Sequence, residues 1–376
     1  MKRVIAILTL IMMLFCTPFL CHAEDTVSIK APSAILVEKT TGKVMFEKDA
    51  DNRMRPASVT KIMTLLLIIE AIEGGQYGYS DTVTVSANAT SMGGSQVYLK
   101  EGEIFTVEEM IKCIAVASAN DCCVAMAEHT AGSEDAFVER MNERATELGM
   151  TNTEFKNCTG LDADGHLTTA RDISAMSREL LSHEDIKKFT CIWTDSIRDG
   201  SFGLSNTNKL IRFYDGATGL KTGYTSLSGY CMSASAVRNG MELIAVVMAS
   251  KTSPERNEDA KALLNYGFGA YEIFTPEFPK LTPIKIIKGK EKQIIPSTDP
   301  LTGIVVKKGT SKLAEYSTDI CKDVKAPVEK GQKLGEFKVT VDGEEIYKNN
   351  IVSPDFYKKA GIIDIFLQIL HYFLIV

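Results

Sequence analysis

The chain has 376 residues, of which 45% are hydrophobic and 24% charged, so it has the composition and length of a globular protein with one large core or two domains. Its formal net charge of −6, without a basic patch interleaved with aromatic residues, argues against nucleic acid as a partner.

Residues 1–23 have the pattern of a secretory signal peptide. A positive start, MKR, precedes the apolar run VIAILTLIMMLF, and small residues end at Ala23. The alternative is a membrane anchor, but the run is short of the roughly 20 residues that a span needs. We therefore expect export, with cleavage near Ala23.

Nine cysteines are present, and Cys16 and Cys21 belong to the signal. An odd number of remaining cysteines, without a Cys-x-x-Cys pair, argues against a disulfide framework or a zinc site. The seven are Cys113, Cys122, Cys123, Cys158, Cys191, Cys231 and Cys321.

Residues 24–276 carry the signals of one mixed domain. Alternation around a Thr-Gly turn predicts a β-hairpin over 33–48, and Pro56 suits the first turn of a helix. Helical spacing of apolar residues covers 106–130 and 134–148, and a further helix follows Thr169.

After residue 215 this domain becomes rich in β-structure. Three strand-like segments, TGLKTGYT, GYCMSASAV and ELIAVVMAS, precede a helix over 255–268, and Asn239-Gly240 predicts a tight hairpin. The order indicates an α+β fold, with one antiparallel sheet covered by helices.

Short alternating segments cut by Pro and Gly predict a small all-β domain over residues 277–352. The tail, 353–376, is apolar except for Asp364, Gln368 and His371, which form one stripe on a helix. An amphipathic helix lying in a membrane surface fits best. The alternatives are a helix packed on its own domain and a short membrane span.

Ser58 and Lys61 are the first candidate site residues. On a helix they share one face, and a serine nucleophile needs a base, which a lysine supplies when burial and nearby positive charge favour its neutral form. Neither Gly-x-Ser-x-Gly nor His-Glu-x-x-His occurs, and the calcium-like stretch 162–166 lacks the closing Glu because Ile173 stands there. The pair alone is a weak signal.

Two further motifs join this pair. Ser118 and Asn120 lie in the turn between two helical runs, where a hydroxyl can relay a proton and an amide can hold a substrate carbonyl. A second copy of Ser-Ala-Asn starts at Ser86, but it follows a strand in a loop, so we favour the later copy.

Lys221, Thr222 and Gly223 form the third motif, on a strand that must lie at the edge of a cleft. Lys221 would lower the pKa of Lys61 and attract a carboxylate, and Gly223 would let a substrate backbone approach closely.

In this order the three motifs resemble those of the penicillin-recognising serine acyl transferases. Within them the chain resembles the low-molecular-mass penicillin-binding proteins that are D-alanyl-D-alanine carboxypeptidases, over nearly all of its mature length. Segments such as GGSQVYLKEGE, GLDADGHLTTARD and RNEDAKALLNYGF add to the likeness. The resemblance implies a β-lactamase/transpeptidase-like domain, a small β domain and an amphipathic tail.

The resemblance also implies roles for individual residues. Ser58 would be acylated, Lys61 would be its base, and the N–H groups of Ser58 and Tyr224 would bind the oxyanion. Arg256 would help to bind the terminal carboxylate of the substrate. Ala119 and Tyr224 depart from the family, where Gly and His are frequent. The full set is Ser58, Lys61, Ser118, Asn120, Lys221, Thr222, Gly223, Tyr224 and Arg256.

By this resemblance the enzyme removes the last D-alanine from peptidoglycan stem pentapeptides, is acylated by β-lactams and needs no cofactor or metal. The tail would lie on the outer face of the bacterial cytoplasmic membrane. A β-lactamase would need a Glu-x-x-x-Asn that 157–172 does not offer. Minor transpeptidase activity and a non-enzymatic wall-binding scaffold remain alternatives.

Overall fold

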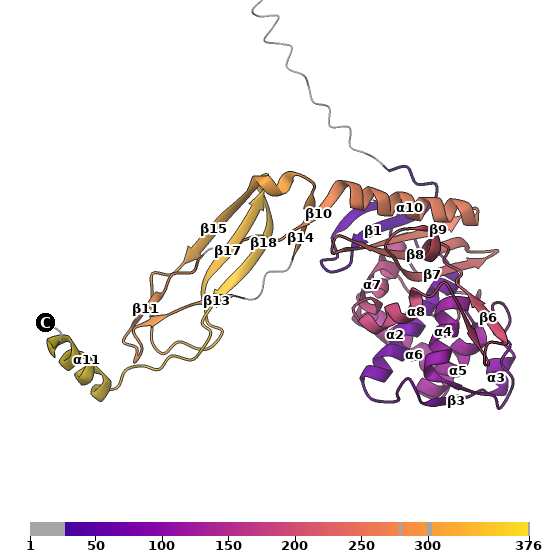
Figure 1. Ribbon diagram of the computed structural model, residues 1–376, viewed down its shortest axis with the longest axis horizontal. Helices are drawn as coiled ribbons and strands as arrows, with labels where there is room; N and C mark the ends of the chain where they lie inside the picture. The colour runs from indigo at the N-terminus through magenta and orange to yellow at the C-terminus, as the bar shows by residue number, and fades with distance from the viewer. Residues whose placement is uncertain (1–26, 278–279, 299–302, 375–376) are drawn as a thin grey trace, which may run out of the picture.

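The computed structural model describes residues 27–277, 280–298 and 303–374, so the signal peptide expected over 1–23 lies outside the described residues. A larger domain, built from β1 to α10, contains a sheet with helices on both faces (Figure 1). A slender β domain, from β10 to β18, extends from it, and a helix, α11, lies at the far end.

The sheet of the larger domain has five antiparallel strands in the order β2-β1-β9-β8-β7. The expected β8–β9 hairpin is present, and its turn has Asn239 and Gly240 at φ 51° and 77°, the left-handed values that a tight hairpin turn requires. The strands are β1 (Ser33–Glu38), β2 (Val44–Lys48), β7 (Ala217–Thr225), β8 (Gly229–Arg238) and β9 (Met241–Ser250).

Helices bury both faces of this sheet. On one face α10 (Ser253–Ala270) packs Leu263 and Leu264 against the strands. The opposite face is covered by α2 (Lys61–Glu73) and α7 (Ala170–Leu180), with α5 and α6 (Glu134–Glu147) stacked behind them (Figure 1). Because α2 is buried over most of its length, its first turn is fixed inside the domain.

The helical spacing over 106–130 corresponds to two helices and a break. α4 (Val107–Lys112) begins with a capping box between Thr106 and Glu109 and continues into the π-helical turn η2 (Cys113–Ala117). Ser118 then adopts left-handed angles, φ 63° and ψ 32°, before α5 (Asn120–Ala131) starts. The second motif therefore lies at the break, as expected for a functional turn.

Short elements complete the larger domain. They are β3 (Thr82–Thr84), α3 (Ala87–Thr90), β4 (Ile104–Thr106), η3 (Glu184–Ile186), α8 (Lys187–Thr190), β5 (Thr194–Ile197), β6 (Phe202–Ser205) and α9 (Leu210–Phe213).

The β domain is joined to the larger domain by the pairing of β10 with β14. Beyond this junction, two small sheets, β12-β11-β16 and β13-β18-β17-β15, enclose cores that include Ile284, Leu334 and Phe337. The strands are β10 (Tyr271–Phe274), β11 (Ile284–Ile287), β12 (Gln293–Ile294), β13 (Ser297–Thr298), β14 (Ile304–Lys307), β15 (Ala314–Ile320), β16 (Asp323–Lys325), β17 (Lys333–Val341) and β18 (Glu344–Val352), with η4 at Thr310–Leu313.

The tail contains the expected helix, α11 (Ile362–Leu374). Asp364 caps its start, accepting a hydrogen bond of 2.9 Å from the N–H of Gly361. The side chains of Gln368 and His371, the rest of the expected polar stripe, lie outside what the structure describes. No helix among the described residues is both long and apolar enough to cross a membrane.

Two glycines of α10 offer a stability test. A Cβ on Gly267 would lie 2.5 Å from Leu243 Cδ1 and 2.9 Å from Leu36 Cδ2. A Cβ on Gly269, which is exposed, would have no such neighbour within 4 Å. Gly267→Ala should lower the free energy of unfolding by about 1–3 kcal/mol through overpacking. Gly269→Ala should raise it by up to about 1 kcal/mol, because alanine favours helix. Urea denaturation would measure both, and equal effects would contradict this packing.

Candidate active site

Ser58 and Lys61 lie at the entry to α2. The chain turns through the 3₁₀ helix η1 (Ala57–Thr60), and Lys61 is the first residue of α2. The tight turn places Lys61 Nζ 2.9 Å from Ser58 Oγ, so the predicted contact of amine and hydroxyl is present. Ser58 is half-buried and so remains open to a ligand.

The amine of Lys61 is completely enclosed. Its relative exposure is 0%, and besides Ser58 it donates to Asn120 Oδ1 and to the carbonyl of Thr159, each at 2.6 Å. Burial is the main cause that lowers the pKa of Lys61 from 10.5. Three acceptors stabilise the ammonium while burial disfavours it, which suits a group that gains and loses one proton.

Two thiols lie close enough to influence Lys61. Burial raises the pKa of Cys123 to about 12 and that of Cys158 well above 9.0, so both are neutral at pH 7. Both are free and buried, as are Cys113 and Cys122. The neutral thiols of Cys123 and Cys158 are therefore part of the packing around the amine.

Asn120 is itself held from two sides. Its Nδ2 donates to the carbonyl of Gly93 at 2.7 Å, and its backbone N–H donates to Ser95 at the same distance. The buried carboxylate of Asp121 accepts from the N–H groups of Val97 and Leu99. The loop over 93–99 is thus fastened to the start of α5, which fixes the amide beside Lys61.

Ser118 lies on the strained turn before Asn120 and is 4% exposed. Within the described residues its hydroxyl makes no hydrogen bond, so its predicted relay contact to Lys61 stays a prediction. The competing copy of the motif has a structural use, because Ser86 caps α3 by accepting from the N–H of Ala89 at 3.0 Å.

Lys221 and Thr222 are on a strand, as predicted, and this strand, β7, is at one edge of the sheet. Lys221 is 1% exposed and donates to the carbonyl of Thr222 at 2.9 Å. Burial, then the positive charges of Lys61 and Arg256, lower its pKa well below 10.5. The buried basic side chains of Lys221 and Arg256 make this side of the site attractive to an anion.

Gly223 is required by a close backbone approach. A Cβ there would lie 2.9 Å from both the carbonyl oxygen of Pro56 and the backbone nitrogen of Ser58, and 3.0 Å from Ala57 Cβ. None of these atoms is the end of a flexible side chain. Glycine at this position therefore allows β7 to run directly against η1.

Tyr224 and Arg256 are connected through the ring of Tyr230. Tyr224, 55% exposed, stacks on Tyr230 with centroids 4.2 Å apart, and the guanidinium of Arg256 lies 5.9 Å from the Tyr230 ring. Arg256 is 5% exposed and bonds to Ser253 and Asn257. Burial lowers its pKa to about 10, and no carboxylate of the described residues pairs with it.

The loop after Phe155 was missed as a source of site residues. Thr159 supplies a carbonyl to Lys61, and Asn157 Oδ1 shapes the turn by accepting from the N–H groups of Thr159 and Gly160. Gly160 has φ 83°, and a Cβ there would overlap the carbonyl of Ala57. The Asn-x-x-Gly spacing in NCTG is the sequence signal of this turn.

His166 lies beneath the entry to α2. The N–H of Lys156 donates to Nδ1 at 3.2 Å, so Nε2 carries the proton and donates to Thr60 Oγ1 at 2.9 Å. Burial, then the charge of Arg55, lowers its pKa to about 4. The ring is therefore neutral at pH 7 and supports the residue before Lys61.

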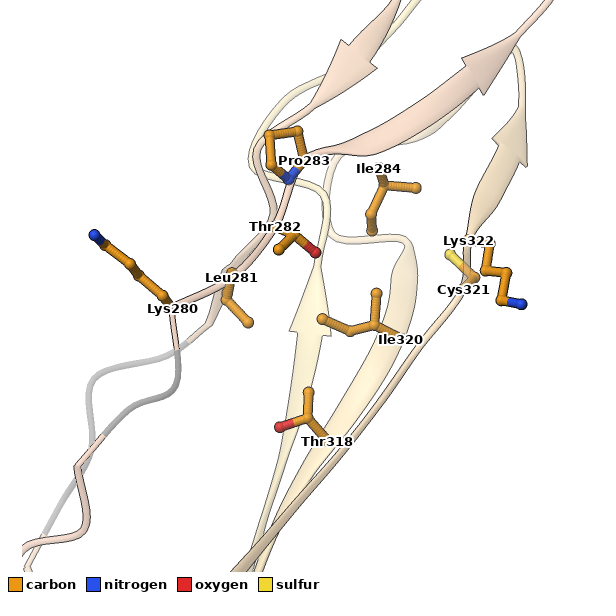
Figure 2. A pocket seen from close by; sticks show the side chains of 9 residues that line it. All are labelled: Lys280, Leu281, Thr282, Pro283, Ile284, Thr318, Ile320, Cys321 and Lys322. Atoms are coloured by element: carbon orange, nitrogen blue, oxygen red, sulfur yellow. The ribbon is translucent and has the colours of Figure 1, made fainter.

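Two other places among the described residues have features of a binding site. In the β domain a cavity of about 340 Å³ lies beside Cys321, and Figure 2 shows Leu281, Ile284 and Ile320 turned into it while Lys280 and Lys322 point away. The cavity contains no acid–base pair. Its lining residues are Lys280, Leu281, Thr282, Pro283, Ile284, Thr318, Ile320, Cys321 and Lys322.

A group of metal-ligating type exists at the opposite end of α2. Glu70, Glu179 and His183 offer ligand atoms within 4.8 Å of one another. Arg144 already bridges the two carboxylates, at 2.8 and 2.5 Å, and Glu73 binds His183 Nδ1 at 2.8 Å. These contacts connect α2, α6 and α7, so we interpret the group as a structural ion-pair network.

A serine beside a buried lysine, at the entry to a helix and next to the strand that carries Lys221, is an arrangement that acyl transfer can use. The fold and this arrangement define the class of penicillin-recognising serine acyl transferases.

Comparisons with known proteins narrow this class. A family model described as D-alanyl-D-alanine carboxypeptidase matches residues 21–252, and one described as penicillin-binding protein 5, C-terminal domain, matches residues 278–359. D-alanyl-D-alanine carboxypeptidase DacF of Bacillus subtilis is 43% identical, with 96% of each chain covered. DacA of Escherichia coli K12 is 33% identical over 90% of this chain and 89% of its own.

Solved structures of penicillin-binding proteins have the same fold as this chain. Penicillin-binding protein 5 from Haemophilus influenzae has a TM-score of 0.80 at 27% identity, covering 88% of this chain and 98% of its own. Penicillin-binding protein D2 from Listeria monocytogenes, solved with ampicillin bound, has a TM-score of 0.59 at 28% identity and covers 65% of this chain and 99% of its own. The chain belongs to the D-alanyl-D-alanine carboxypeptidase family and is a serine-type hydrolase.

His166 predicts a specific acid sensitivity. In the folded protein its pKa is about 4, whereas an unfolded histidine titrates near 6.5. Its contribution to stability is therefore complete above pH 6.5 and is lost as the pH falls and the unfolded state takes up a proton. At about pH 4.5 the loss should be on the order of 2–3 kcal/mol.

The measurement is urea denaturation at several pH values for the wild type and for His166→Gln, which cannot titrate. The variant should be less stable at pH 7 but should lose less stability on acidification. Parallel pH profiles would contradict a neutral buried ring.

Proposed function

We propose that the mature chain removes the terminal D-alanine from peptidoglycan stem pentapeptides through an acyl-enzyme on Ser58, and that penicillins acylate the same serine. The observation that carries this proposal is the 2.9 Å contact between Ser58 Oγ and the buried amine of Lys61. Burial lowers the pKa of that amine, so it can accept the hydroxyl proton.

In acylation, Ser58 Oγ bonds to the carbonyl carbon of the penultimate D-alanine and its proton passes to Lys61 Nζ. The N–H groups of Ser58 and Tyr224 stabilise the oxyanion. The C–N bond then breaks, and a proton delivered through the Ser118 hydroxyl leaves with the amine of free D-alanine. Water hydrolyses the ester in a second step, which restores Ser58.

Substrate is held by charge and by shape. Lys221 and Arg256, both buried and without a carboxylate partner among the described residues, supply the positive charge for the C-terminal carboxylate. Asn120 positions Lys61 by accepting from its amine, while Thr222 is oriented by Thr207 at 2.8 Å.

Ser58→Ala tests the nucleophile. It should abolish release of D-alanine from a synthetic pentapeptide, by at least about 10³-fold, and abolish labelling by a fluorescent penicillin. Ser86→Ala, in the copy that caps α3, is the matched control and should keep both activities. Penicillin labelling that survives Ser58→Ala would refute the proposed acyl-enzyme, and hydrolysis of penicillin without release of D-alanine would favour a β-lactamase.

We further propose that the enzyme is exported and held on the outer face of the cytoplasmic membrane by α11. The support is the signal-like pattern of residues 1–23 and the exposure of the apolar side chains of α11, which reaches 88% for Ile362 and 62% for Phe366. A helix of this kind lies in the interface rather than across it.

Removal of α11 tests the anchor. Residues 357–360 are hydrogen-bonded to the β domain, for example from Val328 N to Tyr357 O at 3.0 Å, so the chain should be cut after Ala360. The truncated enzyme should stay in the supernatant with vesicles and keep full activity on the pentapeptide. Sedimentation of the truncated chain with vesicles would show that the anchor lies elsewhere.

A further inference from the structure

The turn between β11 and β12 is tied to the segment that leads into α11. Lys290 N donates to Lys358 O at 3.0 Å, and Ala360 N donates to Lys288 O at 2.9 Å. An isolated antiparallel bridge joins Gly289 and Lys359 between these two bonds. The start of α11 therefore has a fixed position against the β domain, at the end far from the larger domain (Figure 1).

This tie keeps the lysines of the turn near the apolar helix. Ile362, the first residue of α11, is three residues beyond Lys359, which is at most about 10 Å of extended chain. The exposed apolar side chains of α11 and the turn therefore belong to one end of the molecule. The exposed fractions are Ile362 88%, Ile363 75%, Phe366 62%, Leu367 55%, Ile365 46% and Leu370 45%.

Positive charge collects at the same end. Six exposed lysines lie on β11, the turn and the segment before α11, while the exposed acidic residues nearby are Glu291, Asp323, Glu329 and Asp355. Asp323 is the register partner of Lys285, so its negative charge offsets the positive charge of that lysine. The excess of positive charge therefore lies at the turn between β11 and β12. The six are Lys285, Lys288, Lys290, Lys292, Lys358 and Lys359.

Two apolar side chains stand among these lysines. Ile287, at the end of β11, is 38% exposed, and Phe356, three residues before Lys359, is 47% exposed. Basic and apolar groups presented together on a rigid turn are the composition of a surface that contacts lipid headgroups and the first carbons below them.

We propose that this basic turn, defined by Lys288, Lys292, Lys358 and Lys359, binds anionic phospholipid headgroups while α11 lies in the adjacent interface. The inference rests on the proposed membrane association and adds its lipid class and a second contact, made by the folded β domain. A single interfacial segment binds a membrane reversibly, and stable binding needs a second contact, such as a basic patch.

Charge variants of the full mature chain test the basic turn. Binding is measured by co-sedimentation with vesicles of phosphatidylcholine alone and of phosphatidylcholine with phosphatidylglycerol, at low and high salt. Wild type should bind the anionic vesicles on the order of tenfold or more tightly, and salt should remove this difference. Lys288→Gln with Lys359→Gln should reduce binding to anionic vesicles by on the order of tenfold and leave binding to neutral vesicles unchanged.

The matched control is Lys307→Gln with Lys312→Gln, which removes the same charge from β14 and η4, near the larger domain. It should bind both vesicle types as wild type does, and both double variants should cleave the soluble pentapeptide normally. Equal loss in the two double variants, or equal affinity of wild type for both vesicles, would overturn the basic turn and leave the anchor α11 intact. Failure of wild type to bind either vesicle would overturn the membrane association as well.

Discussion

The rest of the site depends on the burial of one amine. Lys61 would be fully hydrated on the surface of a helix, but here it is enclosed and meets a hydroxyl, an amide oxygen and a backbone carbonyl from three separate segments. A buried cation is costly unless its hydrogen bonds are satisfied, so these segments must assemble correctly for the enzyme to fold around it. The same burial makes the proton of Lys61 available for transfer.

Much of this arrangement could be predicted from the sequence because it depends on short-range spacing. Ser58 and Lys61 share a face, Asn239-Gly240 sets a hairpin, and the alternating pattern around Lys221 and Thr222 indicates a strand. The role of Thr159 could not be predicted, since a backbone carbonyl carries no side-chain signature. The stacking of Tyr224 on Tyr230 could not be predicted either, because it depends on the pairing of β7 with β8, and Arg256 reaches the Tyr230 ring from α10.

Glycines made the long-range contacts possible. Gly223, on β7, and Gly160, in the loop after Phe155, both approach the backbone of residues 56–58. Any side chain at either position would collide with main-chain atoms. A sequence shows that a glycine is present, but it does not show which backbone will lie against it. The π-helical turn before Ser118 was hidden for a similar reason, because its apolar spacing is that of an uninterrupted helix.

The long hairpin of the β domain has a geometric consequence. β17 and β18 have nine residues each, a length of about 30 Å, and they separate α11 from the junction with the larger domain. If α11 rests in the bilayer, these strands act as a spacer of fixed height, and Ser58 works within a narrow layer of the wall above the lipid. Shortening or lengthening the hairpin would then change which peptides the enzyme can reach without changing its chemistry.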